Sequence, residues 1–139
     1  MNAEESTIIR YGYVSDYDAK RHMARVIFPD KENLVSNWLP LLIANSLKNH
    51  DEFHVDINEH VACLMSGNGI ENGVILGAIY DDTNKPPKGN QDIRITTFED
   101  GTSIAYNRAK HALSIDCKGS ITITAKGSMK LTASRIDLN

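Results

Sequence analysis

The histidine and acidic residues between positions 50 and 60 come nearest to a metal site in their types and spacing. His50 and His54 are four residues apart, which would put both side chains on one face of a helix. The surrounding stretch, residues 45–60, is polar, and a solvent-exposed loop accounts for the same residues. We therefore expect a polar insertion and no bound metal here, although the group holds five candidate ligands: His50, Asp51, His54, Asp56 and His60.

A glycine-rich loop and several paired carboxylates resemble cofactor-binding or catalytic motifs. Gly67-Asn68-Gly69 followed by Gly73 is similar to a dinucleotide-binding loop, but it leads into the β-rich run Val74–Tyr80 and not into a helix. No Ser, His and Asp arrangement has the context of a nucleophile elbow. The paired carboxylates lie at turn signals, where Asp favours local hydrogen bonds: Asp16/Asp18, Asp81/Asp82 and Glu99/Asp100. The sequence predicts neither an enzyme nor a cofactor.

Charge and hydropathy argue against two classes of partner. The 139-residue chain has a formal net charge of -3, and clustered Lys and Arg, which provide most nonspecific affinity for nucleic acid, do not gather around the aromatic residues Trp38 and Tyr80. No apolar run approaches the ~18 residues that span a bilayer, and Met1–Ser6 does not begin a signal peptide. We expect no nucleic-acid partner, synthesis in a cytoplasm, and only mechanical contact with membranes. Cys63 and Cys117 have no metal-ligand spacing and are expected to be buried free thiols.

Short strands separated by turn residues occupy the first half of the chain. Five runs are predicted as strands: Ile8–Tyr17, Met23–Phe28, Leu34–Ile43, Val61–Met65 and Val74–Tyr80. Pro40 cannot donate a hydrogen bond to a sheet and indicates an edge or a bend. Five strands in residues 1–85 fit a small closed or partly open barrel of the oligonucleotide/oligosaccharide-binding (OB) type, with a sandwich fragment as the alternative. Residues 86–108 are predicted as the linker and the approach to a second domain, because the polar stretch Asp81–Gln91 contains Pro86-Pro87.

Residues 109–139 contain an eight-residue repeat. Leu113–Ser120 is followed by Ile121–Ser128 and then by Met129–Arg135, which is one residue shorter. Apolar and polar residues alternate within each unit, so that one face of every strand is apolar. Gly119 and Gly127 supply the turns, as does Gly101 further upstream. The apolar face carries eight side chains: Leu113, Ile115, Ile121, Ile123, Met129, Leu131, Ile136 and Leu138.

An eight-residue unit is too short to enclose a core by itself, because a coil of a single-chain solenoid needs about twenty residues or more. Three copies wrapped around an axis, with the apolar faces inward, would bury these side chains. A meander lying against the chain's own barrel is the alternative. The sequence therefore favours an all-β homotrimer with a stem formed by residues 109–139.

The order of these features resembles the baseplate assembly protein V or central spike family of contractile phage tails, which is related to the spike part of the type VI secretion valine-glycine repeat protein. Five stretches carry the resemblance: Arg10–Ser15, Ala24–Asp30, Val35–Pro40, Gly73–Tyr80 and Phe98–Asn107. It implies an N-terminal OB-fold-like barrel, a C-terminal intertwined triple-stranded β-helix stem, and a homotrimer seated under a baseplate hub protein. Such a subunit is structural and belongs to the virion tail baseplate, assembled in the bacterial host cytoplasm.

Two departures limit what the resemblance implies: the sequence lacks a His-any-His motif, and its stem is short, with a last strand that leaves open backbone edges. Longer members of the family hold an iron ion in a tapered tip through a His-any-His motif, which this sequence lacks, so we expect no metal and a separate spike-tip protein at the C-terminal end. Trp38 and Tyr80 are the candidate hub interface. The alternative from another class is a monomeric OB-fold module that binds an oligosaccharide or nucleic acid.

Overall fold

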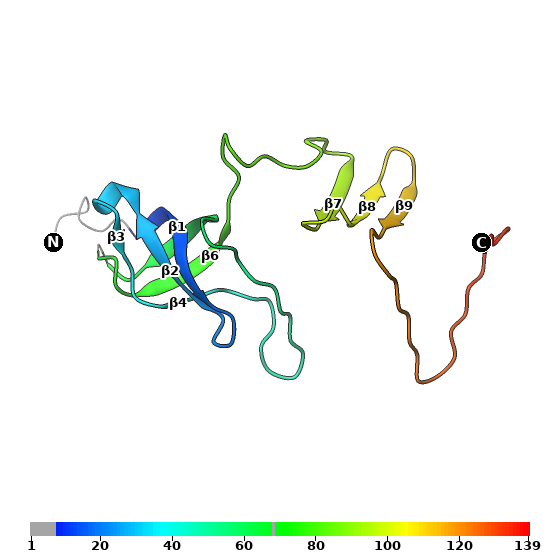
Figure 1. The fold of residues 1–139 in the computed structure, drawn as a ribbon, viewed down its shortest axis with the longest axis horizontal. Coiled ribbons are helices and arrows are strands. Elements are labelled where there is room, and N and C mark those ends of the chain that lie inside the picture. The colour runs from blue at the N-terminus through cyan, green and yellow to red at the C-terminus, as the bar shows by residue number, and fades with distance from the viewer. Residues whose placement is uncertain (1–7, 68) are drawn as a thin grey trace. The chain divides into compact units, whose positions relative to one another are not determined.

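A computed structural model describes residues 8–67 and 69–139. Met1–Ser6, on which the expectation of no signal peptide depends, and Asn68 of the glycine loop lie outside the described residues. The chain divides into two compact units, Met1–Pro86 and Pro87–Asn139 (Figure 1). Strands and one short 3-10 turn, η2 (Pro29–Lys31), are the regular elements of the described residues, which confirms the predicted all-β class.

The first unit is a six-stranded sheet. Its strands follow the order β3-β2-β1-β5-β6, and β4 also pairs with β2. Every ladder in this sheet is antiparallel. The strands are β1 (Ile9–Asp18), β2 (Met23–Phe28), β3 (Leu34–Val35), β4 (Leu39–Pro40), β5 (His60–Met65) and β6 (Gly73–Ala78).

Alternation along these strands places the core of the first unit. In β2, Ala24, Val26 and Phe28 are buried, while the residues between them are partly exposed, as expected where side chains point to opposite faces in turn. Gly12 of β1 is required by close packing, because an added Cβ would lie 2.4 Å from the carbonyl oxygen of Ile27. The buried apolar side chains form one cluster: Val14, Ala24, Val26, Phe28, Leu39, Leu41, Val55, Val61, Cys63, Met65 and Ile75.

The predicted third strand, Leu34–Ile43, is interrupted. It forms two short strands, β3 and β4, because the buried Ser36 between them turns its hydroxyl to accept a hydrogen bond from the Val26 amide at 3.0 Å. Beyond Pro40, Leu41 makes a parallel bridge with Ile75 of β6. This single bridge joins the two ends of the sheet, but no continuous ladder does so among the described residues, so the barrel is not closed.

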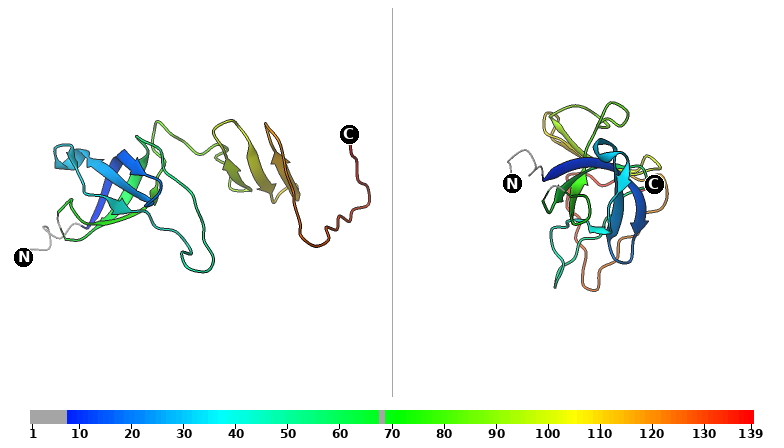
Figure 2. Two further views of the ribbon diagram at one scale, coloured as in Figure 1. Left: turned by 60° about the horizontal axis from the view of Figure 1, so that its bottom comes forward. Right: turned by 90° about the vertical axis from the view of Figure 1, so that its left-hand side faces the viewer.

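The second unit begins with a three-stranded antiparallel meander in the order β7-β8-β9 (Figure 2). Its strands are β7 (Ile93–Thr97), β8 (Ser103–Asn107) and β9 (Ala112–Asp116). Two of them, β7 and β8, lie in residues 86–108, which are predicted as a linker and the approach to the stem. The alternation of Ile93 with Ile95 and of Ile104 with Tyr106 is the signal that identifies them.

Candidate functional site

The β7-β8-β9 meander carries an exposed apolar face. Ile104 of β8 lies opposite Ile115 of β9, and Tyr106 lies opposite Leu113. The residues between them point to the other face of the sheet. All four side chains are between 43 and 67% exposed. Ile104 and Tyr106 are absent from the predicted set of apolar stem positions, although their spacing repeats that of Leu113 and Ile115.

The eight predicted stem side chains are also exposed to solvent. Leu113 and Ile115 lie on β9, and the other six lie in Cys117–Asn139, where the described chain forms no strand pairing with itself. The eight side chains are between 51 and 89% exposed. A single chain therefore exposes all eight apolar side chains, and the backbone that carries six of them is not paired within that chain.

Bends in the terminal segment follow the eight-residue repeat. They fall at Lys118-Gly119, at Lys126-Gly127 and at Ser134. Of the three glycines predicted as stem turns, Gly101 adopts the left-handed region with φ 91° in the turn between β7 and β8, where glycine avoids the steric penalty of a Cβ. Gly119 and Gly127 bend without a positive φ, and an added Cβ at either would meet no atom within 4 Å.

The two aromatic residues predicted as a hub interface have different surroundings. Trp38 precedes β4, and the guanidinium carbon of Arg21 lies 5.0 Å from the centre of its ring. Arg21 is held in turn by Asp18, whose Oδ2 lies 2.7 Å from the arginine Nε. Tyr80 follows β6 and is 62% exposed. Arg21 thus covers one face of the Trp38 ring, whereas Tyr80 is open to a partner.

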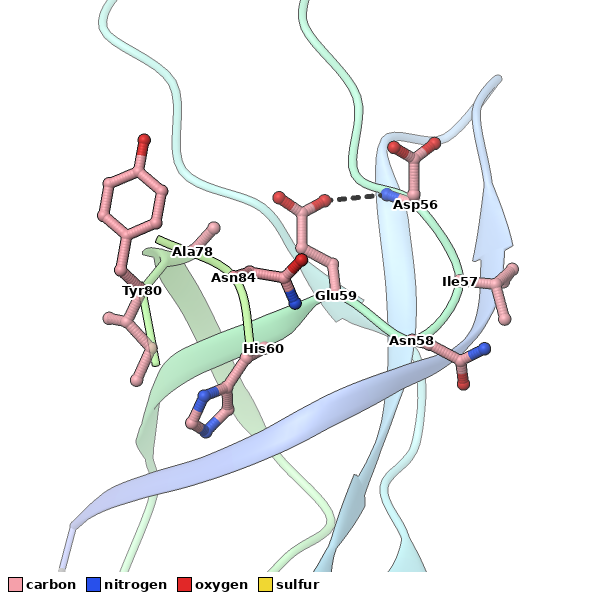
Figure 3. Close-up of a pocket in the computed structure, with 9 residues that line it drawn as sticks. Asp56, Ile57, Asn58, Glu59, His60, Ala78, Tyr80 and Asn84 are labelled. Carbon is pink, nitrogen blue, oxygen red and sulfur yellow. Dashed lines mark hydrogen bonds between the residues drawn. The ribbon is translucent and has the colours of Figure 1, made fainter. Parts of the chain in front are cut away.

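Tyr80 borders an open cleft of about 560 Å³ in the first unit. Figure 3 shows Tyr80 and Ala78 on one chain segment at the left, while Glu59, Ile57 and Asn58 come from another segment and the last two point away from Tyr80. The Glu59 carboxylate accepts a hydrogen bond from the Asp56 amide at 2.9 Å. The polar side chains around this cleft therefore do not converge on one point, as the binding of a small ligand would require.

His60 and Asp81 form a polar pair beside the cleft. Nδ1 of His60 lies 3.1 Å from Oδ2 of Asp81, and the imidazole stacks on the Tyr13 ring with centroids 4.6 Å apart. The backbone amide of Asn84, the amide of Thr83 and the nearby His60 together lower the pKa of Asp81. These contacts fix the turn after β6, and they account for Asp81 as a structural residue.

The histidines of the insertion take part in local packing. Residues 51–56 are irregular, as expected for a polar loop, so no helix face brings His50 and His54 together, and His50 bridges to Ser46. His54 contacts the Tyr17 hydroxyl through Nδ1 and the Glu52 carboxylate through Nε2 at 2.9 Å. In residues 8–67 and 69–139, no three His, Cys, Asp or Glu side chains gather closely enough to hold a metal ion.

The two cysteines differ in their surroundings. Cys63 is buried in the core of the first unit, and burial raises the pKa of its thiol to about 12. Cys117 is only partly buried, and its Sγ lies 3.4 Å from the Ser120 carbonyl oxygen. The expectation that both thiols are buried is therefore wrong for Cys117 in the single chain, because the terminal segment packs on little of its own chain.

The described residues define an all-β protein with a compact first unit and a second unit that exposes a repeated apolar surface. No helix long and apolar enough to cross a bilayer occurs in this described part. No protein-family model matches the chain. It is 25% identical over 140 residues to a protein of Escherichia phage P2 named Spike protein, and the match covers 95% of this chain and 65% of that relative. The similarity is to a phage spike protein, as the family resemblance predicts, and it supports that general class.

Proposed function

We propose that this chain is the central spike subunit of a contractile phage tail or of a phage-tail-like injection system, and that it works as a homotrimer. The observation that carries the proposal is the exposure of all eight apolar stem side chains, six of which lie on Cys117–Asn139, where the described chain has no strand pairing of its own. Each such side chain gains about 1.5–3 kcal/mol when it is fully buried. Three copies around an axis would bury all of them and pair their backbones. The similarity to a phage spike protein points to the same role.

The proposed architecture assigns a different fold to each unit. The first unit is an OB-fold-like barrel of the partly open kind; its strand order and the Leu41–Ile75 bridge, beside which the Leu42 amide donates to the Ile75 carbonyl at 3.0 Å, support this assignment. Cys117–Asn139 and β9 form an intertwined triple-stranded β-helix with two other copies. The bends spaced eight residues apart would bring each apolar pair back to the axis.

The proposed action is mechanical and not catalytic. Three chains make a stiff prism below the baseplate hub protein, and sheath contraction drives this prism against or through the target envelope. The exposed Tyr80 is the better of the two candidate hub contacts, because Arg21 covers one face of Trp38. A separate tip protein would cover the open strand edges at the C-terminal end of the stem. A complex in which that end stays free in solvent would refute the tip assignment.

Static light scattering of the purified chain tests the proposal. A trimer has a mass of about 46 kDa, three times the 15.4 kDa of one chain. The trimer should persist in mild denaturant, because its chains are intertwined. A mass of 15.4 kDa would instead support the monomeric OB-fold binding module, whose ligands would then be sought among oligosaccharides and nucleic acids.

A further inference from the structure

The outer face of the first unit carries rows of apolar and aromatic residues. Between β1 and β5, Ile9 lies opposite Leu64, Tyr11 opposite Ala62, and Tyr13 opposite His60. The alternate residues of β1, which are Arg10, Gly12 and Val14, are buried on the other side of the sheet. The outward rows contain no Asp, Glu, Lys or Arg, which is unusual for a sheet face in water. We call these three rows the tyrosine face.

The tyrosine face has the size of patches that often serve binding. It continues onto β6 through Leu76 and reaches Val35 of β3 by way of Ile27, which pairs with both Tyr13 and Val35. Ile9, Tyr11, Tyr13, Leu64, Leu76 and Val35 are each between 37 and 55% exposed. Together they expose on the order of 500 Å² of mostly apolar surface, a size at which patches on soluble proteins commonly serve binding.

The composition of the face indicates the kind of surface it would contact. A nucleic acid is disfavoured, because the rows offer no cation to a phosphate. The tyrosine hydroxyls and the stacked His60 ring suit a protein surface, since aromatic residues are enriched at the centre of protein interfaces. His60 is engaged by Asp81 and Tyr13, so that the face is fixed before any contact is made.

The area of the face favours a partner that is already held nearby. A stable complex between separate proteins buries about 800 Å² on each side, which is more than the tyrosine face provides. Linked modules meet at an effective concentration in the millimolar range, where a smaller contact is sufficient. The proposed stem would tether three first units in this way through the polar residues Asp81–Gln91.

We infer that the tyrosine face packs against the first unit of another copy of this chain, so that the trimer has a second contact separate from the stem. This inference rests on the proposed function, because the tether is the trimeric stem. The stem residues would supply the strength of association. The tyrosine face would hold the three first units together as one rigid body.

Hydroxyl-radical footprinting of the full chain in its trimeric form, read by mass spectrometry, tests the inference. The rate of Tyr11 oxidation should be at least about threefold lower in the trimer than in the assembly-deficient variant Ile123→Asp, because a contact shields the ring. Leu47, which is 82% exposed on the β4–β5 connection, is the internal control and should react equally in both. Equal Tyr11 rates in trimer and variant would overturn the inference and leave the face to a different protein.

The variant Tyr11→Glu provides a second measurement. It should retain the mass of about 46 kDa but show a larger radius of gyration in small-angle X-ray scattering, because the first units separate while the stem stays assembled. Leu47→Glu is the matched control and should change neither quantity. An unchanged radius in Tyr11→Glu would refute the inference alone, whereas a wild-type mass of 15.4 kDa would refute the proposed function as well.

Discussion

Replacing Ile123 with aspartate tests the proposed trimer axis most directly. Ile123 is 71% exposed in the single chain and lies in the middle of the terminal segment. In a monomer the substitution removes little buried surface, and an exposed substitution of this kind changes the free energy of folding by about 0.5 kcal/mol or less. In the proposed trimer the same change places three carboxyl groups on one apolar axis.

The free-energy cost of Ile123→Asp in the trimer follows from the exposure of Ile123 in the single chain. Assembly would bury the exposed 71% of each Ile123 side chain, so losing it costs about 1–2 kcal/mol per chain. Burying a neutral carboxyl without a partner costs about 1–3 kcal/mol more per chain, and an ionised one costs more. Summed over three chains, the loss is on the order of 10 kcal/mol. Each 1.4 kcal/mol changes an equilibrium constant for association tenfold. The trimer should therefore dissociate at micromolar protein concentration.

Light scattering at several protein concentrations provides the assay. Ile123→Asp should give the mass of one chain, 15.4 kDa. Thr124→Asp is the matched control, because the next residue along a strand points to the opposite, polar face; it should remain a trimer. If Ile123→Asp assembles as well as the wild type does, or if both variants dissociate equally, the alternation argument for an apolar axis is wrong.

Three further predictions concern single features of the chain. Gly12→Ala should lower the free energy of unfolding by about 1–3 kcal/mol or more in urea titrations, because the new Cβ would lie 2.4 Å from a carbonyl oxygen, whereas Gly69→Ala, with open space around it, should not. Ellman's reagent should leave Cys63 unmodified in the folded protein, because burial raises its pKa to about 12, while Cys117 should react in the Ile123→Asp monomer and be protected in the trimer. The pKa of Asp81 is lowered from 3.8 by folding, so its stabilising contribution is present above that pH and lost as the pH falls through the lower folded value. The melting temperature of Asp81→Asn should therefore change less than that of the wild type between pH 7 and pH 3.

The outcomes that would contradict these predictions are equally specific. Equal stability of the Gly12 and Gly69 variants would mean that β1 and β2 do not approach as closely as described. Rapid labelling of Cys63 in the folded protein would place that thiol outside the core. A parallel loss of melting temperature with falling pH in Asp81→Asn and in the wild type would show that other carboxylates cause the acid sensitivity.

The candidate stem positions are a prediction from local pattern. The positions from Leu113 to Leu138 were identified by strict alternation and by the repeat of eight, and the bends at Lys118, Lys126 and Ser134 keep the same spacing. Ile104 and Tyr106 were missed, since the proline-rich linker before them masked a two-residue alternation that is equally regular. The tyrosine face was missed for another reason: the residues that form it come from separate strands, and only their register brings them together.

The sequence by itself determined which residues are apolar, how often they recur, and that the chain folds as strands. Those properties depend on neighbours along the chain, because the two-residue period of a strand assigns each side chain to a face. Only the tertiary structure decided that Leu34–Ile43 divides around Ser36, that His54 contacts Tyr17, and that Arg21 covers Trp38. The residues that make these contacts are 10 to 37 positions apart. Strand pairing and the course of the loops bring them together, and local pattern specifies neither.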